Sequence, residues 1–331
     1  MRSLTLRAAC LGALFATLQS SPSTAREFRF ADLLPAGSPS VETVLHLDSV
    51  LRERTNGRLG IAVGYGTPDS ENFIVSQLRL GLLDMARVNL AAFHSTVPAT
   101  IVPNLPYLFR SDAHFRRTLD GPIGDRILAA MEKEGFIGLC FYDMGTRSIY
   151  SAQQPIRRVE DIRGMTIRVQ PSPAAVEVIR ALGAKPLALP FDHVDDALKA
   201  GVVDAAENSW TAFVAAGHDK VAKYYNLTEH AQMPSVLVVS RKTWNELSRV
   251  EQVALRAAAN DSVPYLHGRL EAFNIIASAQ VERSGVEVVK DVDRKSFADV
   301  LVPLYPRLLP DRRLQALVQK IQAGSETATV P

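Results

Sequence analysis

The stretch DIRGMTIRVQ, residues 161–170, decides how this chain folds, because a short apolar strand in it ends close to a cation. Residues 165–169 have the apolar and β-branched character of a buried strand, and Arg168 stands near its end. A second arginine, Arg147, follows another apolar run, and the sequence DAAEN at residues 204–208 comes after both. Two arginines at strand ends, followed by a carboxylate and an amide, predict a preformed clamp for a small anionic solute. The pattern favours capture of that solute over its chemical turnover.

Outward from this stretch, short apolar strands alternate with amphipathic helices. This alternation is typical of an α/β fold, with helices layered on a largely parallel sheet. Strands are predicted at residues 27–32, 60–65, 84–88, 136–142, 165–169, 185–189 and 236–240.

Helix signals lie between most of these strands. Residues 41–54 carry an apolar stripe that stops at Asn56-Gly57, and Ser70 before an acidic residue predicts an N-cap. The sequence SRVE at residues 248–251 is a capping box, and it predicts a helix running to about Gly285. A helix of about 35 residues is far longer than the globular average, so we expect it to pack along two lobes of the protein.

The first residues predict export. Residues 1–7 carry two arginines and no acid, and residues 8–18 form an apolar run too short to span a bilayer. Small residues follow, so we expect a signal peptide, residues 1–25, that is cleaved and directs the chain to the periplasm. A non-cleaved anchor is the alternative. Cys10 lies inside the apolar run and not after it, which disfavours lipid attachment there.

Cleavage would leave a chain without net charge. Two of the 37 basic residues, Arg2 and Arg7, would be lost, and the 35 that remain equal the 35 acidic ones. No overall field then attracts nucleic acid or a membrane surface, so an anion must be recognised by a few placed cations. The 306 residues left of 331 can bury a sizeable core, which we expect to form two lobes.

The remaining motifs argue against catalysis. Cys140 would be the one thiol left, and its apolar strand context predicts a buried structural side chain. The chain has no G-x-S-x-G, H-E-x-x-H, C-x-x-C or phosphate-loop motif, and its seven histidines are scattered. We therefore expect no catalytic residue, no metal site and no cofactor.

Beyond Arg168 the chain resembles a known family. DIRGMTIRVQ is followed by ALGAKP at 181–186, LPF at 189–191 and GVVDAAEN at 201–208. This order is seen in the extracytoplasmic solute-binding proteins of TRAP transporters, the DctP-like family. LGLLDM at 80–85 and LPYLF at 105–109 are similar to that family as well. The resemblance covers essentially the whole chain after the signal peptide.

The resemblance implies a two-lobed periplasmic-binding-protein fold that closes around a solute, with crossing hinge strands and a long helix, about 249–284, spanning both lobes. The first lobe would comprise residues 26–145 with about 236–270, and the second residues 146–235 with about 271–325. The solute, in most members an organic acid, would be handed to the small and large subunits of a membrane permease. Most family members are monomers, which is the expectation here.

The resemblance also implies site residues. An arginine matching Arg168 generally forms the salt bridge to the substrate carboxylate, and Arg147 matches a second arginine at the same group. Asn208 matches an asparagine that bridges arginine and solute, and Phe191 an aromatic that packs on the ligand. A guanidinium suits this role because its parallel N–H donors fit a carboxylate and its charge persists in a dry cleft. The alternatives are a surface arginine at 168, a pair of Arg147 with Asp143, an N-cap at Asn208 and ordinary core packing at Phe191.

A narrower resemblance suggests the ligand. DMARVN at 84–89, ENSW at 207–210 and HDKVAKYYNLTEH at 218–230 are similar to the members that bind uronates and related sugar acids. A sugar acid needs hydrogen-bonding groups for its hydroxyls as well as a charge clamp. The candidates for these contacts are Glu71, Asn89, Asn208, His230, Gln170 and Trp210. The alternatives are a helix cap for Glu71 and a structural histidine at His230.

The loop after the first strand departs from that pattern. Close sugar-acid binders often carry a histidine and a tyrosine where this chain has Leu34 and Ser38, so two polar contacts are expected to be missing. A hexuronate such as D-glucuronate or D-galacturonate is the leading expectation, with an aldonate, a keto acid or a C4 dicarboxylate as alternatives. From other classes, a sensory binding protein and a periplasmic enzyme with Glu71 or His230 as general base remain open.

Overall fold

The computed structural model describes residues 25–66 and 70–324. The predicted signal peptide lies outside the described residues except for Ala25, so the structure does not test it. Within those described ranges, no helix combines the length and the apolar character needed to cross a membrane.

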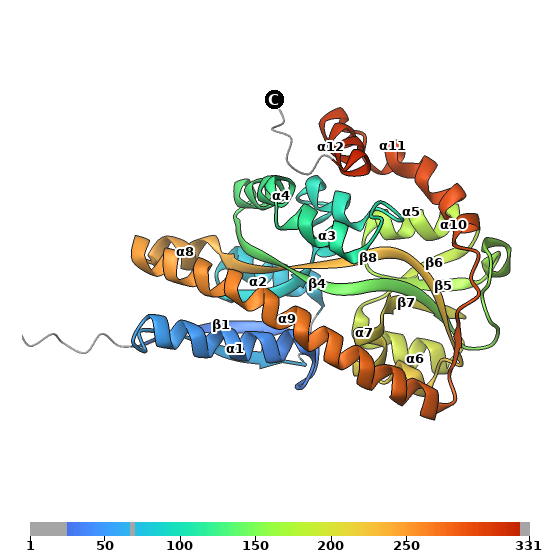
Figure 1. Cartoon of the computed structure of the whole chain (residues 1–331), viewed down its shortest axis with the longest axis horizontal. Helices are drawn as coiled ribbons and strands as arrows, with labels where there is room; N and C mark the ends of the chain where they lie inside the picture. Colours follow the sequence, from blue (N-terminus) through green and yellow to red (C-terminus); the bar gives the residue numbers. More distant parts are fainter. Residues whose placement is uncertain (1–24, 67–69, 325–331) are drawn as a thin grey trace, which may run out of the picture.

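Nine strands of the described chain form one mixed sheet (Figure 1). The strands are β1 (Arg26–Asp32), β2 (Leu59–Tyr65), β3 (Met85–Asn89), β4 (Phe136–Ser151), β5 (Thr166–Val169), β6 (Lys185–Ala188), β7 (Ala205–Ser209), β8 (Tyr224–Ser240) and β9 (Glu287–Val289). Their order is β2-β1-β3-β8-β4-β7-β5-β6, with β9 paired to β8.

Helices cover the sheet on both faces. The α-helices of the described ranges are α1 (Pro39–Arg54), α2 (Glu71–Leu80), α3 (Asp112–Leu119), α4 (Pro122–Lys133), α5 (Pro173–Ala181), α6 (Val194–Lys199), α7 (Trp210–Ala215), α8 (Arg241–Glu246), α9 (Arg249–Ser284), α10 (Arg294–Leu301), α11 (Tyr305–Leu308) and α12 (Arg312–Ala323). Short 3-10 helices join them: η1 (Leu90–Phe93), η2 (Pro98–Asn104), η3 (Val159–Ile162), η4 (Phe191–His193), η5 (His218–Lys220) and η6 (Val302–Leu304).

The sheet has two parallel flanks and an antiparallel centre. On one flank β1 pairs in parallel with β2 and β3, and on the other β5 pairs in parallel with β6 and β7. Between them, β4 and β8 run antiparallel to each other. The prediction of a largely parallel sheet therefore holds for the flanks and is wrong for the centre. We refer to the β1, β2 and β3 side as the β1 lobe and to the β5, β6 and β7 side as the β5 lobe.

The strands β4 and β8 cross from one lobe to the other. The beginning of β4 and the end of β8 pair with each other beside β3, while the end of β4 pairs with β7 and the beginning of β8 with β9. The strands predicted at 136–142 and 236–240 are thus only the β1-lobe halves of these two long strands. In β4 the register shifts between Asp143 and Thr146, where Gly145 has φ 84°. Glycine and charged residues at this crossing interrupt the apolar pattern, so no local pattern indicates that the strand continues.

Two strands were not predicted. The residues of β7, AAENS, lack the β-branched and aromatic side chains that favour strands, and pairing with β4 and β5 holds them extended. The three residues of β9 pair with β8. Edge and short strands of this kind depend on their neighbours more than on their own side chains.

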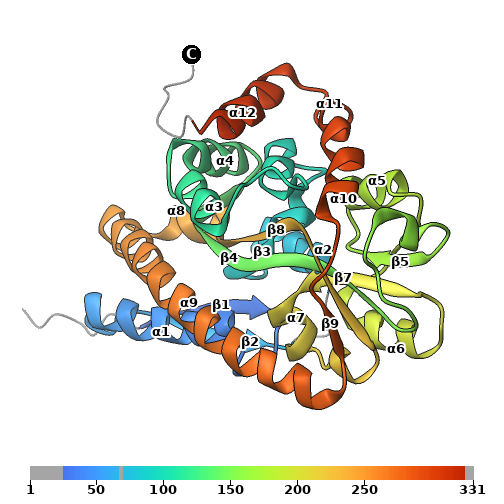
Figure 2. The same ribbon diagram turned by 45° about the vertical axis from the view of Figure 1, so that its right-hand side comes forward.

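The long predicted helix is confirmed as α9, with 36 residues (Figure 1, Figure 2). Its capping box is formed: the Ser248 hydroxyl accepts from the Glu251 N–H at 3.3 Å, and the Glu251 carboxylate accepts from the Ser248 N–H at 2.8 Å. Gly285, with φ 81°, ends the helix. Its first half packs Leu255 and Leu266 among core residues of β1 and α1, and its second half places Val281 in a separate buried cluster that includes Tyr225 at the beginning of β8. The helix therefore ties both lobes together.

The C-terminal helices also bridge the molecule. In Figure 2, α10 lies near α5 while α12 lies over α4. The Tyr305 hydroxyl donates to the carbonyl of Pro106 at 2.5 Å, and Arg307 pairs with Glu177 of α5. The C-terminal helices therefore contact both the segment around Pro106 and helix α5.

Cys140 is buried in β4, as predicted. Its Sγ lies 3.5 Å from the carbonyl of Ala259 in α9, and burial raises the pKa of the thiol above its usual range. A thiol with so small a thiolate fraction is a packing residue and not a nucleophile.

Candidate functional site

A cavity of ≈ 660 Å³ lies between the two lobes. The β1 lobe contributes Leu33, Leu34, Ser70, Glu71, Asn72, Arg87, Asn89, Ala91 and Ala92. The other walls come from Arg168, Gln170, Pro171, Pro190, Phe191, Asn208, Ala212 and Met233. Six of the nine predicted site residues therefore line one cavity, namely Arg168, Asn208, Glu71, Asn89, Phe191 and Gln170.

Arg168 lies in β5 and is held in place by the backbone. Its side chain is buried, with 1% of the residue exposed. Nε and Nη2 both donate to the carbonyl of Leu189, at 2.9 and 2.7 Å. Nη1 is buried and has no hydrogen-bond partner among the described residues. The alternative of a surface arginine is therefore wrong.

The charge of Arg168 is not compensated locally, because no carboxylate of the described chain pairs with it. Burial lowers the pKa of this guanidinium, with smaller effects from Tyr150 and Glu207. A buried cation with an unsatisfied donor is costly for the protein alone. An anion that accepted a hydrogen bond from Nη1 would reduce this cost.

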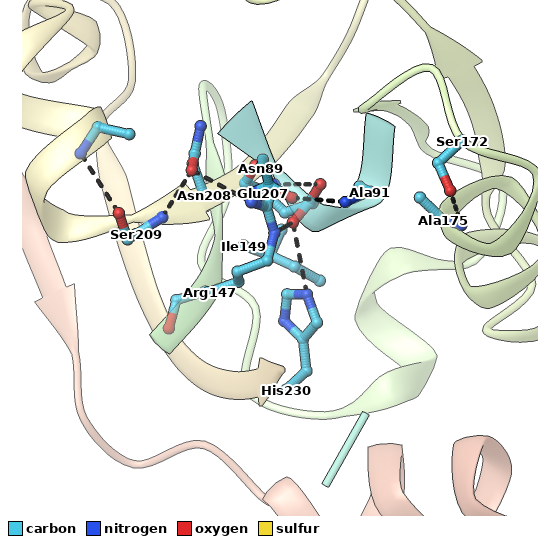
Figure 3. Close-up of polar contacts among 12 residues, drawn as sticks. Asn89, Ala91, Arg147, Ile149, Ser172, Ala175, Glu207, Asn208, Ser209 and His230 are labelled. Atoms are coloured by element: carbon cyan, nitrogen blue, oxygen red, sulfur yellow. Dashed lines mark hydrogen bonds and ion pairs between the residues drawn. The ribbon is translucent and has the colours of Figure 1, made fainter. Parts of the chain in front are cut away.

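Arg147 is placed differently, because it is paired within the protein (Figure 3). Nε and Nη2 donate to the two carboxylate oxygens of Glu207, the second at 2.7 Å, and Nη2 also donates to the Glu207 carbonyl at 2.9 Å. Nη1 donates to Oδ1 of Asn208 at 3.3 Å. Asp143 instead pairs with Arg116 at 2.8 Å, so the alternative pairing of Arg147 with Asp143 is wrong.

The Glu207 carboxylate that pairs with Arg147 stays ionised although it is buried. Burial favours its neutral form, but the charge of Arg147 and the neighbouring His230 outweigh burial and lower the pKa of Glu207 to about 2. The Nε2 of His230 lies 3.6 Å from the Glu207 carboxylate, and its Nδ1 lies 3.0 Å from the Thr228 hydroxyl (Figure 3). Arg147, Glu207 and His230 line a second cavity of ≈ 540 Å³, which shares Ala91 and Gln170 with the first.

Asn208 connects this ion pair to the first cavity. Its Oδ1 accepts from Arg147 and from the Ser209 N–H at 2.9 Å (Figure 3). Two donors to Oδ1 fix the orientation of the amide, so Nδ2 is the group left for a ligand. The N-cap of α7 is Ser209, whose hydroxyl accepts from Ala212 at 3.4 Å, so the N-cap alternative for Asn208 is wrong.

Glu71 faces the cavity from the β1 lobe. It is the first residue of α2, but the cap is Ser70, whose hydroxyl accepts from the Phe73 N–H at 3.2 Å. The Glu71 carboxylate accepts from the Asn89 N–H at 2.9 Å through Oε1. Burial raises the pKa of Glu71, opposed by the charge of Arg87. The helix-cap alternative for Glu71 is therefore wrong.

Asn89 lies beside Glu71 at the end of β3. Its side-chain Oδ1 accepts from the Ala91 N–H at 2.9 Å and caps η1 (Figure 3). Its Nδ2 has no hydrogen-bond partner among the described residues, so this amide, like that of Asn208, can donate to a ligand.

Arg87 was not predicted as a site residue, although it lines the cavity. It lies in β3 and is 4% exposed. Nε donates to Asp32 at 3.0 Å and Nη2 to the other oxygen of the same carboxylate. Its Nη1 lies 3.4 Å from the Ser235 hydroxyl and 3.8 Å from Glu71. A signal was present: Arg87 is the one charged residue in the strand sequence MARVN, and a charge in such a strand indicates a buried ion pair.

The structure separates the remaining candidates. Phe191 lines the cavity and lies beside His218, with ring centroids 5.5 Å apart, and Gln170 lies between the two cavities. Trp210 stacks on Tyr225, with centroids 4.0 Å apart, and is not among the residues lining either cavity. Its ring is used by the core of the β5 lobe.

Leu34 and Ser38, the two loop residues that depart from the pattern of sugar-acid binders, take different positions relative to the cavity. Leu34 lines the cavity, while the Ser38 hydroxyl donates to the carbonyl of Pro35 at 2.8 Å and is buried outside the cavity. Within residues 25–66 and 70–324, no group of three or more His, Cys, Asp and Glu side chains could hold a metal ion.

Two lobes that share crossing strands, with a cavity between them and, in its wall, a buried guanidinium without a carboxylate partner among the described residues, are the features of a solute-binding protein. Residues 30–310 match the family described as bacterial extracellular solute-binding protein, family 7 (DctP). The chain belongs to this family, which confirms the resemblance seen in the sequence.

Relatives and solved structures agree with this assignment. A solute-binding protein of Chromohalobacter salexigens is 30% identical, over 97% of this chain and 96% of its own length. A TRAP periplasmic solute-binding protein from Bradyrhizobium, in complex with α/β-D-galacturonate, is 42% identical with a TM-score of 0.88, over 90% of this chain and 100% of that one. A third protein, from Xanthobacter autotrophicus with bound β-D-galacturonate, is 39% identical with a TM-score of 0.87, over 89% and 99% of the chains.

Proposed function

We propose that this chain is the periplasmic solute-binding subunit of a TRAP transporter and that it captures a hexuronate, such as D-galacturonate or D-glucuronate. One observation carries the proposal: the buried guanidinium of Arg168 lines the cavity with no carboxylate partner and with Nη1 unsatisfied. The two similar structures that hold galacturonate support the choice of a sugar acid.

In the proposed complex, the ligand carboxylate accepts from Nη1 of Arg168 and from Nδ2 of Asn208. Arg147 contributes by holding Oδ1 of Asn208. Phe191 offers an apolar face to the sugar ring, and Glu71 and Asn89 meet hydroxyls from the opposite lobe. Because the two walls belong to different lobes, the ligand would hold the lobes closed and exclude water from its ion pair.

The proposed lobe boundaries follow the crossing strands. The first lobe comprises residues 26–145 with about 236–270, and the second residues 146–235 with about 271–325, with α9 spanning both. The partners proposed are the small and large permease subunits, and the chain would act as a monomer without catalytic activity. The family, whose members are solute-binding proteins, supports this reading.

The first experiment is a thermal-shift and calorimetric screen of the purified protein lacking residues 1–25. The panel holds D-galacturonate, D-glucuronate, an aldonate, a C4 dicarboxylate, a keto acid and neutral galactose. A ligand present at about a hundred times its Kd adds about 2.7 kcal/mol to the free energy of unfolding, which a thermal shift detects. We expect both hexuronates to stabilise the protein and galactose to have no effect.

The clamp is tested with a matched pair of variants. Arg168→Ala should weaken hexuronate binding by about 2–5 kcal/mol, the scale for removing one partner of a desolvated charge pair. Arg163→Ala is the control, because Arg163 belongs to the same stretch but has a side chain that is 68% exposed. Unchanged affinity in Arg168→Ala would contradict the proposed function.

A further inference from the structure

Arg168 lines the cavity from the β5 lobe and Glu71 lines it from the β1 lobe. We call these two walls the ends of the cavity, and they differ in charge. At one end Arg168 has no carboxylate partner, and the neighbouring Arg147 and Glu207 neutralise each other. This end therefore carries one uncompensated positive charge. It is the end that would receive the ligand carboxylate in the proposed function.

At the other end, two carboxylates share one guanidinium. Arg87 directs Nε and Nη2 to Asp32, and only Nη1 is turned towards Glu71, at 3.8 Å. Asp32 is fully buried and engaged, since it also accepts from the Leu34 N–H at 2.9 Å. When Asp32, Glu71 and Arg87 are all ionised they carry one net negative charge, and Glu71 is the carboxylate of the two that lines the cavity. Burial raises the pKa of Glu71, and the charge of Arg87 opposes that effect.

The Glu71 carboxylate is also incompletely satisfied. Oε1 accepts from the Asn89 N–H at 2.9 Å, and Oε2 has no hydrogen-bond partner among the described residues. A carboxylate oxygen accepts only, so it can take a hydroxyl of a ligand but not a second ligand carboxylate. The cavity thus offers a donor and a positive charge at one end, and an acceptor and a negative charge at the other.

We propose that Glu71 makes this cavity selective for monocarboxylates and excludes dicarboxylates of the same length, such as the aldarates. This inference rests on the proposed function, because it takes the Arg168 end as the site of the first carboxylate. A sugar acid satisfies both ends with one carboxylate and distal hydroxyls. An aldarate places a second carboxylate against Glu71 in a closed cleft, where like charges repel strongly because little water screens them.

Arg87 does not relieve this repulsion. Its bidentate contact with Asp32 holds the guanidinium within the β1 lobe, and its remaining nitrogen is already near Ser235 and Glu71. Were Glu71 neutral, the same Arg87 would attract a distal carboxylate. A single change of charge at position 71 should therefore alter which acids bind.

The test compares galactonate with galactarate, two open-chain acids of equal length that differ by one terminal carboxylate, with galacturonate as reference. Calorimetry at neutral pH gives Kd values for the wild type, Glu71→Gln and Glu271→Gln. The last variant removes the same charge from an exposed position on α9. Thermal unfolding without ligand checks that each variant is folded.

In the wild type and Glu271→Gln, galactarate should bind at least about 100-fold more weakly than the better monoacid, a difference of about 2.7 kcal/mol. In Glu71→Gln this ratio should shrink by at least about tenfold. A ratio that Glu71→Gln leaves unchanged, or wild-type protein that binds galactarate as tightly as the monoacids, would overturn the proposal.

The two proposals fail in different ways. If no hexuronate binds the wild type, the proposed function fails. The selectivity assigned to Glu71, which rests on that function, then falls with it. If hexuronates bind and Glu71→Gln does not alter the ratio, only the role of Glu71 fails.

Discussion

Nδ1 of His94 lies 2.8 Å from the hydroxyl of Ser172, and this hydrogen bond joins the two lobes. His94 follows η1 in the β1 lobe, whereas Ser172 precedes α5 in the β5 lobe. The other ring nitrogen of His94 lies 3.1 Å from Asn104 in its own lobe. One histidine therefore has one contact across the cleft and one within a lobe.

Removing the contact across the cleft should loosen the closed form. We predict that Ser172→Ala weakens ligand binding by about 1 kcal/mol, the usual net contribution of a hydrogen bond. Asn104→Ala, which removes the other contact of His94, should leave affinity closer to that of the wild type. Calorimetry with the best hexuronate measures both, and equal losses in the two variants would contradict a role in closure.

Stability should fall as the pH drops from about 6.5 to about 4. Burial lowers the pKa of His94 to about 4, and burial with the charge of Arg168 lowers that of His218 to about 4, from an ordinary value of 6.5. Below 6.5 the unfolded chain takes up protons that the folded chain does not bind until about 4, so unfolding is favoured. The full loss is roughly 3 kcal/mol for each histidine.

Urea unfolding of the wild type and of His94→Asn and His218→Asn, between pH 7 and 5, measures this effect. Each variant should flatten the decline of stability with falling pH. The range stops at 5 because Glu207, whose pKa is lowered to about 2, begins to contribute below its ordinary value of 4.5. Slopes equal to the wild-type slope would show that neither histidine is responsible.

Removing one partner of the buried pair Arg147 and Glu207 should destabilise the protein more than replacing both partners. Glu207→Ala leaves the Arg147 charge buried without its partner and should cost about 3–5 kcal/mol of stability. The double variant Arg147→Met/Glu207→Leu should recover part of that loss, yet bind ligand weakly because Asn208 loses its Arg147 contact. Urea unfolding and calorimetry measure the two effects, and a double variant no more stable than Glu207→Ala would refute the prediction.

Arg168 should not be replaceable by lysine. Nε and Nη2 donate to the Leu189 carbonyl, and Nη1 has no hydrogen-bond partner among the described residues. A single ammonium cannot place donors at both positions in the same fixed geometry. We predict at least about tenfold weaker hexuronate binding in Arg168→Lys, or about 1.4 kcal/mol. Arg163→Lys serves as the exposed control. Affinity within twofold of the wild type in Arg168→Lys would show that binding does not depend on the donor geometry of the guanidinium.

The parts of the fold that could be predicted are those with local signals. The capping box at Ser248 and Glu251 and the glycine at 285 mark α9 within a few residues. The crossing strands could not be predicted to full length, because Gly145 and the charged residues beside it break the apolar pattern of β4. What holds them extended is pairing with β8 and β7, which are distant in sequence.

Only some features of the site could be predicted, for a related reason. Arg168 was found because its family motif is contiguous, and the structure places it in the cavity wall. The pairing of Arg147 with Glu207, 60 residues later, depends on how β4 and β7 align, which no local pattern encodes. Trp210 was chosen because it belongs to the ENSW motif at 207–210, but it is the first residue of α7, and its ring stacks on Tyr225.

The crossing of β4, β8 and α9 means that neither lobe is a continuous piece of the chain. The β1 lobe holds the first residues of the sheet, yet β3 gains its second neighbour only when the end of β8, at Ser240, is available. During synthesis, more than two thirds of the protein must therefore emerge before its first lobe can assemble. Neither lobe can be excised by cutting the gene at a single point, and exchanging lobes between relatives would require several junctions.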